Sequence, residues 1–207
     1  AGVLNLVTGA GETGAALVGN RDVRVISFTG STETGLKVYA QAAAMGKKVT
    51  LEMGGKNAII VLDDANLELA VEAITWSAYG TTGQRCTATS RLIVQKGIKS
   101  KLVEALVEKA KSLKVGNGLD ETVNMGPLVN QKARDKGEKY VEIGKGEGAK
   151  LAVGGYRLDN TKGYFYAPTL FTDVAREMRI AREEIFGPVL SVIAVNDLEE
   201  AVEVNNE

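Results

Sequence analysis

Short apolar runs with strand character alternate with helical stretches of 10–15 residues along most of the chain. Parallel strands that are buried on both faces read as continuous apolar runs, and each is joined to the next through a crossover that is usually a helix. Expected strands cover residues 3–7, 23–28, 49–51, 58–62, 89–95, 150–153, 169–171 and 189–195. The pattern predicts an α/β fold with a mostly parallel sheet flanked by helices.

Turn and capping residues indicate where helices begin and end. The Gly-Ser-Thr sequence at 30–32 predicts the start of a helix that ends near Met45, with Gly46 directly beyond it. The aspartate pair 63–64 predicts the N-cap of a helix over residues 67–79. Further helices are expected at about 102–113, 131–145 and from 198 onward.

Histidine does not occur in the 207 residues. This excludes Ser-His-Asp and Cys-His catalysis and every metal site that needs imidazole, so we expect no metal. The single cysteine, Cys86, excludes intrachain disulfides and cysteine-cluster zinc sites and fits a reducing compartment. Any chemistry must therefore come from carboxylates, hydroxyls, lysines or this one thiol.

The charges balance, with 25 basic against 26 acidic side chains. No net field attracts nucleic acid or an anionic membrane. No apolar run approaches the roughly 20 residues of a membrane span, and no signal peptide follows Ala1. We expect a cytoplasmic globular protein without nucleic-acid or membrane partners.

Residues Gly9–Gly14 spell G-x-G-x-x-G after a strand-like run. A dinucleotide site of this kind needs an acidic residue about 20 positions later, at the end of the next strand. The candidate Glu33 lies instead at the start of a helix. A plain glycine-rich turn is therefore the favoured interpretation.

The segment 28–35 runs from a strand through a glycine turn into a helix that opens with hydroxyl side chains. Free N–H groups and the helix dipole make such a helix start suitable for an anion. Alternatively, Ser31 or Thr32 is a simple N-cap. The segment by itself leaves both interpretations open.

Cys86 is flanked by Gln84, Arg85 and Thr87. A lone cysteine is more often a small buried hydrophobic residue than a reactive one. The polar neighbours favour reactivity, because Arg85, backbone dipoles or a cofactor's charge could stabilise the nucleophilic thiolate.

Two acidic segments could also carry chemistry. Glu52 ends a strand between Leu51 and Met53, where partial burial would raise its pKa toward that of a general base. An ion pair with Lys56 is the alternative that this segment alone favours. The segment 183–188, Glu-Glu-Ile-Phe-Gly-Pro, could be an ordinary connection from a helix to a strand.

Taken together, residues 28–35, 51–57, 83–91 and 183–189 resemble the NAD(P)-dependent aldehyde dehydrogenase superfamily, with its motifs in the family's order. Residues 80–91 and 141–145 are most similar to the semialdehyde branch that includes 2,5-dioxovalerate dehydrogenases.

The resemblance implies residue roles. Cys86 attacks the aldehyde, hydride passes to the nicotinamide of NAD or NADP, and Glu52 activates the water that hydrolyses the resulting thioester. The Cys86 N–H helps to bind the oxyanion. The implied cofactor-binding residues are Gly30, Ser31 and Gly35 at the pyrophosphate, Glu184 at the nicotinamide ribose and Phe186 beside the nicotinamide.

Family members are more than twice this length, which implies that the chain is a fragment. Residues 1–51 would be the C-terminal piece of the NAD(P)-binding domain, and residues 52–207 the catalytic domain, truncated at its C-terminal end. The parent would be a homodimer or homotetramer, and the isolated chain would reduce NAD(P)⁺ negligibly. Two alternatives remain: a CoA-acylating aldehyde dehydrogenase, which would not need Glu52, and a non-catalytic binding or scaffold protein.

Overall fold

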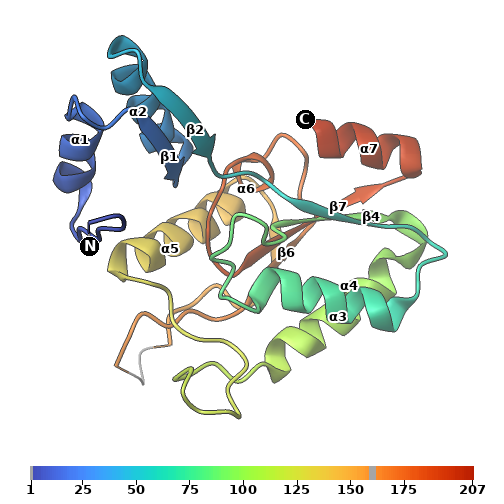
Figure 1. Ribbon diagram of the computed structural model, residues 1–207. Helices are drawn as coiled ribbons and strands as arrows, with labels where there is room; N and C mark the ends of the chain where they lie inside the picture. The colour runs from blue at the N-terminus through green and yellow to red at the C-terminus, as the bar shows by residue number, and fades with distance from the viewer. Residues whose placement is uncertain (1, 159–161) are drawn as a thin grey trace. The chain divides into compact units, whose positions relative to one another are not determined.

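The computed structural model describes residues 2–158 and 162–207. The chain divides into two compact units, Ala1–Gly54 and Gly55–Glu207. Each unit is described by itself below (Figure 1). No helix of the described residues is long and apolar enough to cross a membrane.

The smaller unit is a β-α-β element preceded by one helix. Strands β1 (Val25–Thr29) and β2 (Lys48–Glu52) are parallel and joined by helix α2 (Thr32–Ala44). Helix α1 (Gly11–Gly19) packs against α2. Gly46 follows α2 with a φ of 66°, which confirms the predicted helix end.

Two sequence expectations fail in this unit. Residues 3–7 form no strand, and the side chains of Val3, Leu4 and Leu6 are 99%, 93% and 89% exposed. A strand needs a partner for its backbone groups, and in the described structure β1 and β2 pair only with each other. The G-x-G-x-x-G segment is not a simple turn either, because α1 begins at Gly11 inside it.

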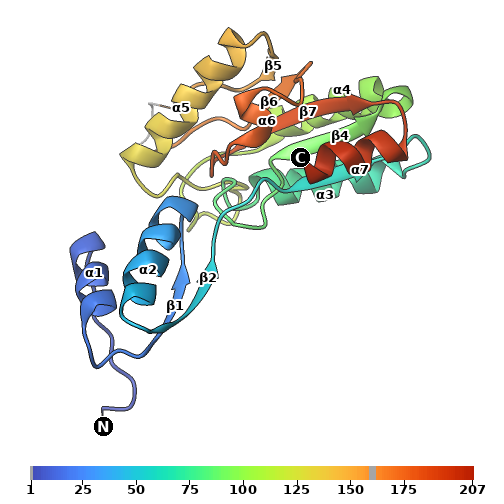
Figure 2. The same cartoon turned by 90° about the horizontal axis from the view of Figure 1, so that it is seen from above.

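The larger unit is built on a five-stranded sheet in the order β3-β4-β7-β6-β5. All neighbours are parallel except β5, which runs antiparallel to β6. Figure 2 shows β4, β7 and β6 side by side. The strands are β3 (Ala58–Val61), β4 (Arg91–Gln95), β5 (Lys150–Val153), β6 (Thr169–Thr172) and β7 (Val189–Val195). The helices are α3 (Leu67–Tyr79), α4 (Lys96–Ser112), α5 (Gln131–Gly146), α6 (Arg179–Arg182) and α7 (Leu198–Asn206).

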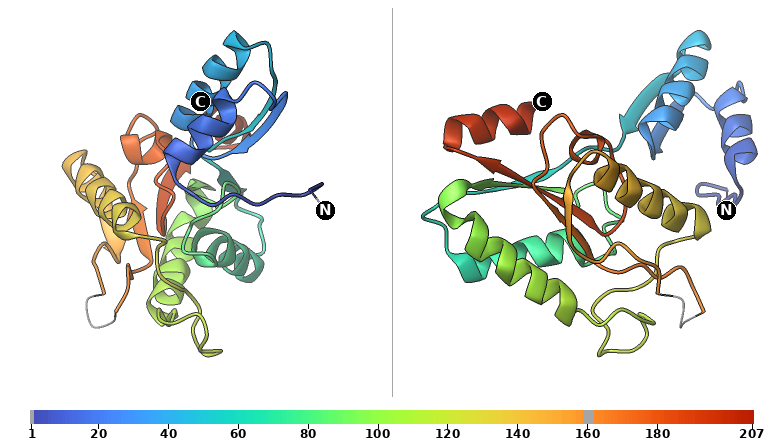
Figure 3. Two further views of the ribbon diagram at one scale, coloured as in Figure 1. Left: turned by 60° about the vertical axis from the view of Figure 1, so that its left-hand side comes forward. Right: turned by 180° about the vertical axis from the view of Figure 1, so that it is seen from behind.

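Alternate residues of the central strands face opposite helical layers. Leu92 and Val94 of β4 belong to one core cluster with residues of α3 and α4. Ile93, between them, belongs to the other cluster, with residues of α5, α6 and α7. This alternation is the two-residue period of a strand covered on both faces. Figure 3 (right) shows α7, in red, on the opposite side of the sheet from the green helices, and the predicted α/β fold is confirmed.

Helix α3 is capped by Asn66, whose side chain accepts the Leu69 N–H at 3.0 Å. The prediction that the aspartate pair caps this helix is wrong, because a capping oxygen must come from the residue directly before the first turn. Asp63 instead accepts the N–H of Ile98 in α4 at 2.9 Å. Helix α6 was not predicted, because its four residues are too few to show a helical period.

Candidate functional site

Cys86 lies in the loop between α3 and β4, and its side chain is exposed. It lines a cleft of the larger unit together with Glu184 and Phe186. Its backbone N–H donates to no acceptor among the described residues. An exposed thiol beside an uncommitted N–H donor is the arrangement that a nucleophile with an oxyanion site requires.

Hydrogen bonds on the N-terminal side of Cys86 hold this loop in place. Thr82 Oγ1 donates to the Gly126 carbonyl at 3.0 Å. The Gln84 side chain donates to the Pro127 carbonyl at 3.3 Å and accepts the Val129 N–H at 2.9 Å. Thr82 has a φ of 58°, a left-handed conformation that persists in a non-glycine residue only where its surroundings fix it.

Asn57 connects the start of β3 to the same loop. Its Nδ2 donates to the carbonyl of Cys86 and, at 3.4 Å, to that of Ala88. Its own carbonyl accepts the N–H groups of Ser90 at 3.1 Å and Arg91 at 3.0 Å. The loop is therefore tied to β3 on both sides of Ala88.

Arg85 lines the same cleft as Cys86, but its hydrogen bonds go to α3. Its guanidinium donates to the carbonyls of Trp76 at 3.4 Å and Ser77 at 3.3 Å, near the end of α3. It also lies 4.3 Å from the centroid of the Trp76 ring. A cation placed there interacts favourably with the helix dipole and the ring. The hydrogen bonds and the ring contact of Arg85 thus go to α3, while its Nε has no hydrogen-bond partner among the described residues.

The two adjacent glutamates before β7 have different surroundings. Glu183 accepts two hydrogen bonds from Arg179, at 2.7 and 3.0 Å, and one from the Tyr140 hydroxyl at 2.5 Å. These donors, Arg179 first, lower the pKa of Glu183 to about 2. Glu184 is half-buried in the cleft and accepts no hydrogen bond from the part of the chain that is described. Glu183 is therefore a structural anchor, and Glu184 has its acceptors available for a ligand.

Phe186 lies in the same cleft with a φ of 58°. For a bulky residue this backbone conformation is a rare one, and such residues gather at functional sites. Its side chain is 41% exposed. The ring is therefore available to a flat ligand.

Lys56 and Arg91 are both buried at their charged ends. Arg91 is 8% exposed and donates to the Lys56 carbonyl at 3.0 and 2.7 Å and to the Val204 carbonyl at 3.1 Å. The Lys56 ammonium is buried and finds no hydrogen-bond partner among the described residues. Burial first, and then the charge of Arg91, lower the pKa of Lys56 to about 7. No local sequence signal reveals this, because the surrounding elements come from distant parts of the chain.

Glu52 ends β2 in the smaller unit and is exposed. The expectation that it is partly buried is wrong, because among the described residues β1 and β2 pair with no further strand, which leaves this strand end uncovered. Its carbonyl accepts the Gly30 N–H at 3.0 Å.

Gly30, Ser31 and Gly35 lie together at the start of α2. Ser31 is the N-cap of the helix, with its Oγ accepting the Thr34 N–H at 3.3 Å. Gly35 is buried, and a Cβ at this position would lie 2.6 Å from Met53 Sδ. The Thr34 N–H is taken by this cap, and the positive end of the helix dipole favours an anion at the helix start.

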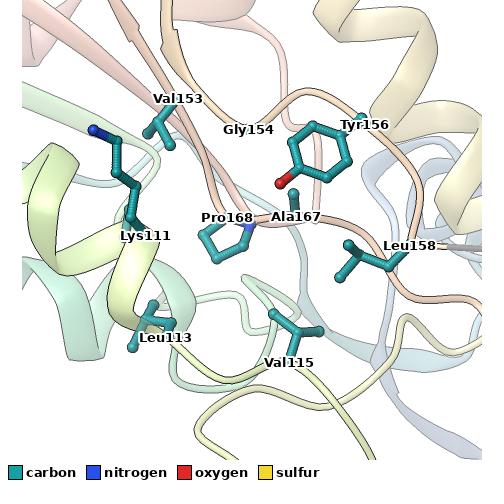
Figure 4. A pocket seen from close by; sticks show the side chains of 10 residues that line it. Lys111, Leu113, Val115, Val153, Gly154, Tyr156, Leu158, Ala167 and Pro168 are labelled. Carbon is teal, nitrogen blue, oxygen red and sulfur yellow. The ribbon is translucent and has the colours of Figure 1, made fainter. Parts of the chain in front are cut away.

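A second pocket of the larger unit, of about 320 Å³, is lined by the end of α4, the end of β5 and the following loops. Figure 4 shows its two polar side chains, Lys111 and Tyr156, on opposite sides among apolar residues. Among the described residues that line it there is neither the thiol nor a carboxylate. Within residues 2–158 and 162–207, no three acidic or cysteine side chains gather as a metal ion would require.

Comparison with known proteins gives a family model that matches residues 1–207, described as the aldehyde dehydrogenase family. Alpha-ketoglutaric semialdehyde dehydrogenase of Bacillus subtilis is 48% identical over 212 residues, and betaine aldehyde dehydrogenase of Brucella anthropi is 47% identical over 209 residues. Both alignments cover 100% of this chain and 43% of the relative. The chain thus spans less than half the length of these relatives.

Solved structures show the same fold. Betaine aldehyde dehydrogenase of Staphylococcus aureus, crystallised with NAD⁺, superposes with a TM-score of 0.94 at 41% identity over 97% of this chain and 40% of that one. A 1-pyrroline-5-carboxylate dehydrogenase from Thermus with bound NAD gives a TM-score of 0.91 at 46% identity, over 96% of this chain and 39% of that one. The chain belongs to the aldehyde dehydrogenase family.

Proposed function

We propose that the protein carrying this chain oxidises an aldehyde to a carboxylic acid, with NAD or NADP as the hydride acceptor. The observation that carries the proposal is the exposed Cys86 in one cleft with Glu184 and Phe186. Dehydrogenase names among the relatives, and NAD⁺ bound to the structural neighbours, support the choice of reaction.

Cys86 is the nucleophile. Its thiolate forms a bond to the aldehyde carbon while the carbonyl electron pair moves to oxygen, which gives a thiohemiacetal anion. The Cys86 N–H stabilises this oxyanion, because no acceptor among the described residues occupies it. Loss of one such donor lowers the rate by about 10²–10³.

The proposed cofactor-binding residues have side chains and backbone groups of the kinds that suit the parts of a dinucleotide. Glu184 offers carboxylate oxygens to ribose hydroxyls, and the Phe186 side chain offers a flat apolar surface beside them. Gly30, Ser31 and Gly35 form a helix start that suits a pyrophosphate. NAD or NADP held by these residues would supply the acceptor for the hydride that leaves the carbon attached to Cys86.

Hydride loss leaves a thioester on Cys86, and hydrolysis completes the reaction. Glu52 is proposed as the general base that takes a proton from water as the water oxygen attacks the thioester carbon. The C–S bond then breaks and regenerates the Cys86 thiolate. In this assignment, residues 1–51 belong to the NAD(P)-binding domain and residues 52–207 to the catalytic domain.

The test is to assay the full-length protein with NAD⁺ and NADP⁺ against a panel that includes a semialdehyde and betaine aldehyde. Wild type is expected to form NADH or NADPH, and Cys86→Ser is expected to form none above background. Cys86→Ser with wild-type turnover, or no turnover of any aldehyde by the wild type, contradicts the proposal.

Assays with and without CoA distinguish water from CoA as the acceptor of the acyl group. Free acid as the product in the presence of CoA supports hydrolysis assisted by Glu52. An acyl-CoA product assigns the protein to the CoA-acylating alternative. The isolated 207-residue chain is expected to be inactive, because it spans only 43% of its relatives.

A further inference from the structure

Asn57 contacts the peptide that follows the nucleophile. Its Nδ2 donates to the carbonyl of Cys86 and to that of Ala88, 3.4 Å away. Cys86 is exposed and its N–H has no acceptor in the described structure, so this carbonyl is the backbone group through which the protein holds Cys86 directly.

Asn57 itself is fixed in place. It directly precedes β3, and its carbonyl accepts the N–H groups of Ser90 and Arg91 and, at 3.4 Å, the Ser90 hydroxyl. β3 in turn pairs with β4 in parallel register from Ala58 opposite Arg91. The Asn57 amide is thus held by residues of the sheet.

From this geometry we propose that Asn57 is a positioning residue for the nucleophile. By holding the Cys86 carbonyl, it fixes the peptide plane after Cys86 and so restrains the backbone from which the thiol and the Cys86 N–H project. Because the Cys86 carbonyl oxygen accepts a hydrogen bond from the Asn57 amide, it does not compete with the oxyanion for hydrogen-bond donors of the site. The inference rests on the proposed role of Cys86.

Three substitutions distinguish the loss of the hydrogen-bond donor of Asn57 from the loss of its side-chain volume. Asn57→Asp keeps the shape but replaces the amide donor by a carboxylate oxygen opposite two carbonyl oxygens. Asn57→Ala removes the group, and Asn57→Ser keeps one shorter donor. Asn124→Ala is the matched control, because the Asn124 side chain also fixes a loop, by accepting the Lys114 N–H at 2.8 Å, and within the described residues its hydrogen bonds go to Lys114 and not to the Cys86 loop.

Two measurements in the full-length protein test the proposal. The first is the rate of Cys86 alkylation by iodoacetamide across pH, followed by mass spectrometry of the Cys86 peptide. The second is the split between kcat and the KM for NAD⁺. Asn57→Asp and Asn57→Ala are expected to lower both kcat and the alkylation rate by about 10- to 100-fold, as for a misplaced reacting group. The KM for NAD⁺ should stay within about twofold, because Asn57 acts on the nucleophile and not on the cofactor.

Asn57→Ser is expected to recover most of the loss, and Asn124→Ala to remain near wild type in both measurements. If Asn57→Ala does not fold, the difference between Asn57→Ser and Asn57→Asp in kcat and in alkylation rate tests the proposal. Folded variants with wild-type alkylation rates and kcat overturn the proposal. If the wild type oxidises no aldehyde but alkylation of Cys86 still depends on Asn57, the proposed function fails while the positioning role stands.

Discussion

Gly83 packs against the backbone of Gly187 so closely that a Cβ at Gly83 would lie 2.2 Å from the Gly187 carbonyl oxygen. Gly83 lies in the segment that leads into Cys86, and Gly187 directly follows Phe186. Contact between the two backbones therefore sets the spacing between the thiol segment and the segment that carries Glu184 and Phe186. Gly83 also has a φ of 66°, which a side chain would disfavour.

Gly83→Ala is expected to destabilise the protein by more than the roughly 1–2 kcal/mol of a left-handed alanine, because the contact adds to the backbone strain. Cys86 alkylation should change as well, since the two segments must separate. Gly137→Ala in α5 is the control, because its Cβ meets nothing within 4 Å and should stabilise the helix by about 0.5–1 kcal/mol. Equal stability of the two variants in urea denaturation would show that the close contact is relaxed at little cost.

Lys56→Met is expected to flatten the pH dependence of stability. The pKa of Lys56 is lowered from 10.5 to about 7 in the folded protein. Between these values the unfolded chain binds a proton that the folded protein has released, so the free energy of unfolding rises with pH. Below about pH 7 both states hold the proton and the burial cost is fully present.

The variant should therefore exceed the wild type in stability at pH 7, and the gap should narrow toward about pH 10. Urea denaturation at a series of pH values measures this, with Lys101→Met, at an exposed position of α4, as the control. Parallel pH profiles for wild type and Lys56→Met would mean that the ammonium is solvated.

Arg91 joins the segment before β3 to the last turn of α7 through the carbonyls of Lys56, Val204 and Asn205. Arg91→Met is expected to lower stability by roughly 1–3 kcal/mol, because buried carbonyls lose their donors. Hydrogen exchange should increase first in α7. Arg176→Met, which removes only exposed ion pairs, should change stability by about 0–1 kcal/mol. Unchanged protection of α7 in Arg91→Met would contradict the assigned role.

Glu183→Gln is expected to be less stable than the wild type mainly at pH values above the ordinary pKa of a carboxyl group. The pKa of Glu183 is lowered from 4.5 to about 2 by Arg179 and Tyr140. The stabilisation is fully present above pH 4.5 and is lost as the pH falls toward 2. The melting temperatures of wild type and variant should therefore converge as the pH falls through this window.

Glu142→Gln removes an exposed pair with Lys145 and serves as the control for Glu183→Gln. A difference between wild type and Glu183→Gln that does not change between pH 4.5 and 2 would rule out the ionised pair as its source.

Local patterns fixed much of the architecture in advance. The runs 150–153 and 189–195 correspond to β5 and β7 with the predicted bounds, since continuous apolar strands between turns are local signals. The helix start at Ser31 was also predictable, because a cap and its first turn are adjacent in sequence. The strand over residues 3–7 failed because a strand depends on a partner that local sequence does not supply.

At the candidate site, the sequence alone determined which groups were available: one thiol, no imidazole and a set of motifs that resemble a family. Only the tertiary structure decided how each group is used. Arg85 donates to α3, and Glu183 pairs with Arg179 whereas Glu184 does not. The Lys56 ammonium is buried, and the Asn57 amide donates to the Cys86 carbonyl. The reason is physical: hydrogen bonding and burial depend on which distant segments meet across the sheet, whereas residue type and spacing are properties of the chain itself.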